Sequence, residues 1–197
     1  TTYVTGMAVI KTCESLRKKI CERGAEYLGC SADAVEFDGQ NVTNLKTGES
    51  ISRQEIGNRV MCFNNEALSA SEAFSSPTSP PPFMVGIAEV EVDKETGVAE
   101  MVDYVAVVDC GTVVNPALAR VQTEGGIAQG IGMALFEDIV YNSKGRNYSN
   151  SFMQYKIPSR LDVGTIRVEF ESSYEPTGPF GAKSIGEIVI ITPSPAI

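Results

Sequence analysis

The segment SASEAFSSPTSPPP, residues 69–82, cannot form a helix or a central strand. Each of its prolines fixes φ and lacks the amide hydrogen that regular structure needs. We therefore expect it to divide the chain into an N-terminal α+β segment, residues 1–68, and a C-terminal segment, residues 83–197. Both a linker between domains and an ordered loop wrapped around a further domain fit this composition, and the loop is favoured. The 197 residues, 43% of them hydrophobic, suffice to bury a core.

Local signals predict the elements on either side of this segment. Before it we expect a helix over 5–28 with Thr5 as N-cap and Gly29 just after its end, then a short hairpin turning at Asp38-Gly39. A second helix over 52–65 has Ser52 as N-cap and Glu55 at the capping-box position. After it, the pattern predicts two hairpin strands, a helix and two further strands: 84–92, 98–108, 116–135, 137–141 and 165–172. The fold class is mixed α/β.

Charge and cysteine content exclude several classes of protein. The net charge is −9, so the surface lacks the basic stripe that a nucleic acid requires. The cluster Arg17-Lys18-Lys19 is read as a solvated helix face rather than a binding patch. No apolar run approaches the roughly 20 residues of a membrane span. The five cysteines and the absence of histidine favour neither disulfides nor a side-chain metal site, and indicate reduced, mostly core cysteines in a cytoplasmic protein.

An unusual helix surrounds Gln129. The run GGIAQGIG at 125–132 places four glycines in one predicted helix, each costing about 0.8–1 kcal/mol relative to alanine. Helices accept this cost where something approaches their backbone closely. One interpretation is that Gly126 and Gly130 clear a face from which the Gln129 amide reaches a buried ligand. The other is that the glycines only permit close packing of the helix.

A second candidate site ends at Glu187. The segment YEPTGPFGAKSIGE at 174–187 is irregular because of its glycines and prolines, and it carries a terminal carboxylate followed at once by Ile188 to Ile191. Such an apolar neighbourhood predicts a partly desolvated carboxylate, which is the better general base near neutral pH. The alternative is an acid at a helix start, stabilised by the helix dipole. The residues alone leave these two open.

Three motifs in order resemble the molybdenum hydroxylase family, which includes xanthine dehydrogenase and aldehyde oxidoreductase. They are GPFGAKSIGE at 178–187, VVDCGTVVNPALARVQTEGGIAQGIGMALFE at 107–137 and TTYVTGMAV at 1–9. The resemblance covers essentially the whole chain. It implies that the chain is the C-terminal part of the molybdopterin-binding domain and has no activity of its own.

The resemblance also implies roles for individual residues. Glu187 is expected to be the catalytic base in a hydroxylation that takes its oxygen from water. Gln129 and Gly130 are expected to contact the molybdenum–molybdopterin cofactor, which occurs as such or as a dinucleotide, and Thr1 and Thr2 to lie near the pterin phosphate. The pterin holds the metal, so no side chain is expected to ligate it. Iron–sulfur clusters and FAD are expected on other domains or subunits.

The substrate is less constrained than the base. General likeness to xanthine dehydrogenase favours a purine-like heterocycle over an aldehyde. Many relatives have a proline pair after the glutamate, whereas this chain has Ile188-Val189, which leaves the active-site mouth open to interpretation. The alternatives are an aldehyde oxidoreductase-type hydroxylase and a non-catalytic α/β accessory module. Expected partners are the remaining molybdenum-domain segments and the iron–sulfur and flavin modules.

Overall fold

The computed structural model describes residues 2–197, in two compact units. The smaller unit is formed by residues 4–76, and the larger by residues 77–197 together with Thr2 and Tyr3. The division falls between Ser76 and Pro77, inside the Ser/Pro-rich segment, which contains no regular secondary structure before strand β4. None of the helices in the described residues has the length and hydrophobicity to span a bilayer.

The smaller unit combines helices with an antiparallel three-stranded sheet of order β1-β2-β3. Its elements are α1 (Thr2–Tyr27, in this unit from Val4 on), the 3-10 turn η1 (Ala32–Ala34), β1 (Val35–Phe37), β2 (Asn41–Asn44), β3 (Ser50–Ser52) and α2 (Arg53–Asn64). The core holds five buried aliphatic side chains: Ile20, Val42, Ile51, Ile56 and Val60. Strand β3 was not expected from the sequence and is only three residues long.

The predicted local signals of this unit are confirmed except at the first helix start. The Oγ of Ser52 accepts the amide of Glu55 at 3.1 Å, and Gly29 follows α1 with φ +63. Thr5 was expected to cap α1 but lies inside it, because the helix already begins at Thr2. Arg17 donates to the Phe37 carbonyl, so the basic cluster is partly engaged within the unit.

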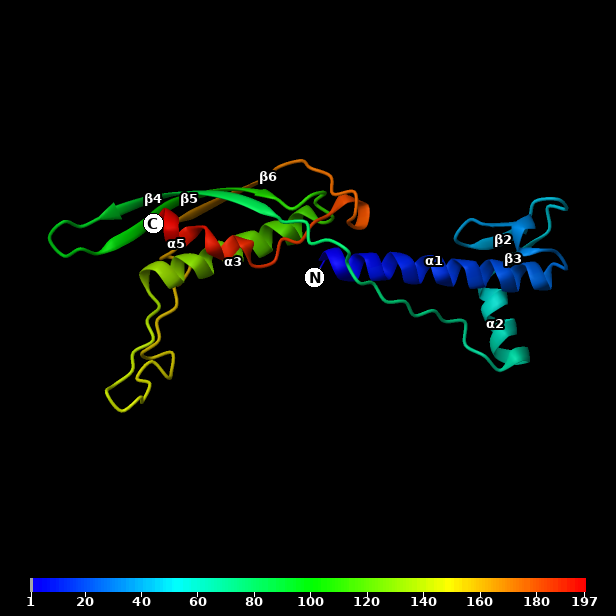
Figure 1. The fold of residues 1–197 in the computed structure, drawn as a ribbon, viewed down its shortest axis with the longest axis horizontal. Helices are drawn as coiled ribbons and strands as arrows, with labels where there is room; N and C mark the ends of the chain where they lie inside the picture. The colour runs from blue at the N-terminus through cyan, green and yellow to red at the C-terminus, as the bar shows by residue number, and fades with distance from the viewer. Residues whose placement is uncertain (1) are drawn as a thin grey trace. The chain divides into compact units, whose positions relative to one another are not determined.

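The larger unit is a three-stranded sheet with one face covered by a helix (Figure 1). Its elements are β4 (Phe83–Val92), β5 (Ala99–Asp109), α3 (Pro116–Leu135), β6 (Thr165–Phe170), the 3-10 turn η2 (Pro179–Gly181), α4 (Ile188–Ile191) and α5 (Pro193–Ala196). Strand β5 pairs antiparallel with β4 and parallel with β6, so α3 is the crossover of a β-α-β unit. The mixed α/β class is therefore confirmed.

The core of this unit lies between the sheet and α3. Tyr104 and Ala106 of β5 and Ile127 and Ile131 of α3 are fully buried there. Burying each of these isoleucine side chains stabilises the fold by roughly 1.5–3 kcal/mol. The start of α3 is fixed by Asn115, whose side-chain oxygen accepts the amide of Leu118 at 3.1 Å.

Two predictions are wrong: the strand over residues 137–141 and the burial of most cysteines. Residues 137–141 form no strand; Tyr141 makes only an isolated bridge with Asn147, because no longer partner strand lies beside it. The cysteines are not mostly in the core. Among the described residues only Cys110 is buried, whereas Cys13 and Cys62 are exposed.

Candidate functional site

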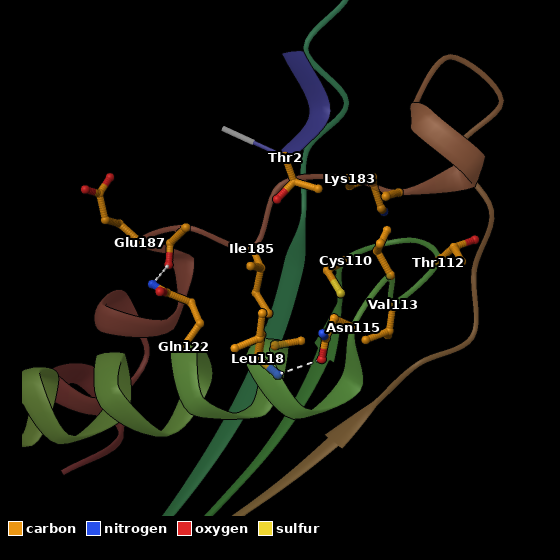
Figure 2. A pocket seen from close by; sticks show the side chains of 14 residues that line it. Thr2, Cys110, Thr112, Val113, Asn115, Leu118, Gln122, Lys183, Ile185 and Glu187 are labelled. Atoms are coloured by element: carbon orange, nitrogen blue, oxygen red, sulfur yellow. Dashed lines mark hydrogen bonds between the residues drawn. The ribbon is translucent and has the colours of Figure 1, made fainter. Parts of the chain in front are cut away.

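A cavity of about 510 Å³ opens where the end of β5, the start of α3 and the segment 182–187 come together. Thr2, the first described residue of α1, completes its wall (Figure 2). The lining is mainly apolar with a few polar side chains: Thr2, Cys110, Thr112, Val113, Val114, Asn115, Leu118, Ala119, Gln122, Ala182, Lys183, Ile185, Gly186 and Glu187. A mostly apolar pocket with a few convergent polar groups is typical of a small-molecule site.

Two backbone links bring the segment 182–187 to the end of β5. The amide of Lys183 donates to the Cys110 carbonyl at 2.7 Å, and the amide of Thr112 donates to the Gly181 carbonyl at 2.8 Å. Gly111 has φ +68, and a Cβ on it would lie 2.8 Å from the Lys183 nitrogen. Glycine is therefore required at position 111, both by the positive φ and by the close approach of the backbone segment around Lys183.

Glu187 lies on the rim of this cavity at the head of α4, with its carboxylate directed away from Gln122 (Figure 2). Its side chain is exposed and makes no capping hydrogen bond to the helix. The apolar run that follows it turns into α4 and buries Val189, so this run does not desolvate the carboxylate in the described chain. The expected desolvation of Glu187 is thus not found here.

Gln122 is a pocket residue that the sequence analysis did not single out. Its side-chain amide donates to the Gly186 carbonyl at 3.1 Å, directly beside Glu187. The signal was present in the spacing, because Gln122 and Gln129 are seven residues apart and so lie on one face of the helix, about 10.5 Å along its axis. Only the packing of the helix shows that Gln122 is the one that contacts the segment carrying Glu187.

The other residues predicted for the cofactor are placed differently. Gln129 is exposed and does not line the cavity. Gly130 is buried, and a Cβ on it would lie 2.7 Å from the Ile190 carbonyl oxygen and 2.7 Å from Cγ of Pro193. The glycines of α3 therefore admit α4 and α5 against the helix, as the close-packing interpretation proposed. Thr1 lies outside the described residues.

A partly buried charge cluster lies at the end of β5. The carboxylate of Asp109 accepts hydrogen bonds from the Lys183 ammonium at 2.5 Å, the Ser173 hydroxyl and the Gly111 amide at 3.1 Å. Burial alone would raise the pKa of Asp109, but these hydrogen bonds outweigh it and the pKa is lowered. Next to it, burial and the Asp109 charge raise the pKa of the Cys110 thiol, which keeps this pocket residue protonated at neutral pH.

Comparison with known proteins gives the family. The model of the molybdopterin cofactor-binding domain matches residues 1–164. The chain is 32% identical to the probable hypoxanthine oxidase XdhD of Escherichia coli (strain K12), over 100% of this chain and 21% of that protein. It is 30% identical to the 6-hydroxypseudooxynicotine dehydrogenase complex subunit gamma of Paenarthrobacter nicotinovorans, over 100% of this chain and 26% of that protein.

The fold is also found in a solved enzyme. Quinoline 2-oxidoreductase from Pseudomonas putida 86 superposes with a TM-score of 0.76 and 26% identity, over 93% of this chain and 24% of that chain. The chain thus spans about a fifth to a quarter of the length of the relatives it matches. These matches confirm the resemblance drawn from the three motifs, and the chain belongs to the molybdopterin cofactor-binding domain family of the molybdenum hydroxylases.

Proposed function

We propose that this chain forms part of a molybdenum-dependent hydroxylase that acts on a purine-like heterocycle, takes oxygen from water and uses Glu187 as its general base. The observation that carries the proposal is the shared pocket, in which Glu187, Gln122 and Thr2 border one mainly apolar cavity. A carboxylate without a capping hydrogen bond, on the rim of such a cavity, is free to accept a proton from a reacting group.

The polar groups around the cavity fit molybdopterin. The pocket is bordered by Thr2 and by Asn115, Leu118 and Ala119 at the start of α3, a helix without an acidic residue in its first turn. The positive end of the α3 dipole favours an anionic group such as the pterin phosphate. The Gln122 amide adds donors and an acceptor for the polar edge of a pterin.

When bound, the cofactor supplies the electron acceptor of the oxidation. The residues of this chain then have separate tasks. Gln122, through its bond to the Gly186 carbonyl, fixes the backbone next to Glu187. Glu187 removes the proton from the attacking oxygen, and the apolar side chains of Val113, Leu118 and Ile185 limit the access of water to the cavity.

The substrate class rests on the names of relatives. Hypoxanthine and quinoline, named in two of them, are both nitrogen heterocycles. We therefore expect the complete cofactor-loaded enzyme to turn over hypoxanthine faster than a simple aromatic aldehyde. The measurement is steady-state kcat/KM for hypoxanthine, quinoline and benzaldehyde on one preparation with known molybdenum content. Faster turnover of the aldehyde would replace this proposal with an aldehyde oxidoreductase, and molybdenum without turnover of any of the three would favour a non-catalytic relative.

This chain covers only about a fifth to a quarter of the length of its relatives. The remaining part of those relatives suggests which partners it has and whether it retains the cofactor alone. The remaining molybdenum-domain segments, and iron–sulfur and flavin modules, are the proposed partners, and one relative is named as a subunit of a complex. We expect this chain alone to retain no molybdenum, because one open cavity buries too little of a cofactor of that size. Stoichiometric molybdenum in the isolated chain would contradict this expectation.

Gln122 and Gln129 allow a matched test of which amide serves the cofactor. We expect Gln122→Ala to lower the molybdenum content of the loaded enzyme several-fold, because it removes a polar group from the pocket wall and the bond to Gly186. Gln129→Ala makes the same truncation two turns along the same helix. Molybdenum content by elemental analysis compares the two variants. A loss confined to Gln129→Ala would support the expected contact of Gln129 with the cofactor and exclude Gln122.

A further inference from the structure

The ion pair of Lys183 and Asp109 is more deeply buried than the exposed ion pairs of this unit. The Lys183 side chain is 10% exposed and that of Asp109 is 21% exposed. The Lys183 ammonium also lies 5.3 Å from the centre of the Phe83 ring, within range of a cation–π interaction. Asp109 is itself held by Ser173 and by the Gly111 amide. Both charges are thus fixed by several neighbours, so the pair has one defined geometry.

This pair joins the segment carrying Glu187 to a rigid element. Asp109 is the last residue of β5, whose backbone is paired on both sides by β4 and β6. Lys183 lies four residues before Glu187 and is 74 positions from Asp109 in sequence. Between Lys183 and α4 the described chain has no regular secondary structure. The ion pair of the Lys183 side chain therefore holds this segment in addition to the backbone hydrogen bonds at Cys110 and Thr112.

A second pair on the same strand provides a comparison. Asp103 of β5, whose side chain is 18% exposed, pairs with Arg167, whose side chain is 61% exposed, so the two pairs differ in the burial of the base and not of the acid. Water screens the exposed guanidinium of Arg167, whereas the better shielded Lys183 loses more when its partner is removed. The two pairs share a strand and an acid type, but only the Lys183–Asp109 pair adjoins the cavity.

We propose that Lys183 is a positioning residue, which through its ion pair with Asp109 holds the segment 183–187 so that Glu187 remains at the pocket rim. This proposal rests on the role of Glu187 proposed above. Lys183 also lines the cavity, so a direct contact with a ligand is the competing explanation. Asp109 does not line the cavity, and this difference separates the two explanations.

The first arm of the test needs no cofactor. Hydrogen–deuterium exchange is measured for the amides of residues 183–188 in the wild type, Lys183→Met, Asp109→Asn and, as the control, Arg167→Met. We expect Lys183→Met and Asp109→Asn to exchange faster in this segment, and Arg167→Met to match the wild type. Unchanged exchange in Lys183→Met would overturn the proposal whatever the role of Glu187. If Lys183→Met fails to fold, Asp109→Asn carries the same test.

The second arm uses the cofactor-loaded enzyme and separates positioning from general instability. A displacement of about 1 Å at a reacting group can lower the rate by about 10²-fold. We expect kcat per molybdenum to fall by about that factor in both Lys183→Met and Asp109→Asn, with KM nearly unchanged, and Lys183→Arg to recover part of it. A loss in Lys183→Met with normal kcat in Asp109→Asn would indicate direct contact and overturn the proposal.

Failure of the catalytic assignment is distinguished by Glu187→Gln in the same series. If Glu187→Gln is fully active, the proposed base is wrong, and the exchange arm still decides whether Lys183 holds the segment. If Glu187→Gln is inactive while Lys183→Met keeps its kcat despite faster exchange, the base stands and the positioning role is overturned.

Discussion

Replacing Glu187 with glutamine is expected to lower kcat of the cofactor-loaded enzyme by about 10²–10⁴-fold, the usual loss when a general base is removed. The glutamine amide keeps the size and polarity of the side chain but does not accept a proton at neutral pH. Glu187 is exposed on the pocket rim and makes no capping hydrogen bond, so the substitution removes no structural contact of the carboxylate within the described chain. The molybdenum content is therefore expected to stay at the wild-type level.

Glu175 offers a matched control in the same segment. Its carboxylate accepts hydrogen bonds from the Thr177 amide at 3.0 Å and the Thr177 hydroxyl at 2.6 Å, and it does not line the cavity. Glu175→Gln makes the same chemical change about a dozen residues away, and we expect kcat to remain near the wild-type value. The measurement is kcat per bound molybdenum with hypoxanthine. Near-normal turnover in Glu187→Gln would show that the base is another residue.

The second large effect is expected in the glycine helix. A Cβ on Gly126 would lie well inside the van der Waals radius of Val189, a fully buried residue of α4, whereas a Cβ on the adjacent Gly125 would meet no atom within 4 Å. We expect Gly126→Ala to lower the free energy of unfolding by about 1–3 kcal/mol, as overpacking does. Gly125→Ala should raise it by up to about 1 kcal/mol, because alanine is the better helix former.

Urea or thermal unfolding of Gly126→Ala, Gly125→Ala and the wild type measures these changes in the free energy of unfolding. Both substitutions add one methyl group to neighbouring residues of one helix, so composition and helix propensity change equally. The difference between them therefore reports the contact with α4 alone. Equal stabilities would mean that α4 does not pack on this face of α3, and the head of α4, where Glu187 lies, would have to be placed elsewhere.

Local sequence signals predicted elements well where a few adjacent residues decide the conformation. Ser52 caps α2 through an amide three residues away, and Asn115 and Pro116 start α3 in the same way. The Asp38-Gly39 turn closes its hairpin with hydrogen bonds from the Gln40 and Asn41 amides to the Asp38 carboxylate. The strand predicted over residues 137–141 failed because a strand needs a partner, and periodicity within the segment does not provide one.

The candidate site was likewise predictable only in part. The sequence by itself determined the class of fold, the family through its three motifs, and Glu187 as the residue to test. Only the tertiary structure showed that Gln122 rather than Gln129 reaches the segment before Glu187, that Glu187 is exposed, and that Lys183 pairs with Asp109. The reason is physical: caps and turns are formed by neighbours along the chain, whereas these contacts join residues 64 and 74 positions apart and exist only when β5, α3 and the last segment have packed together.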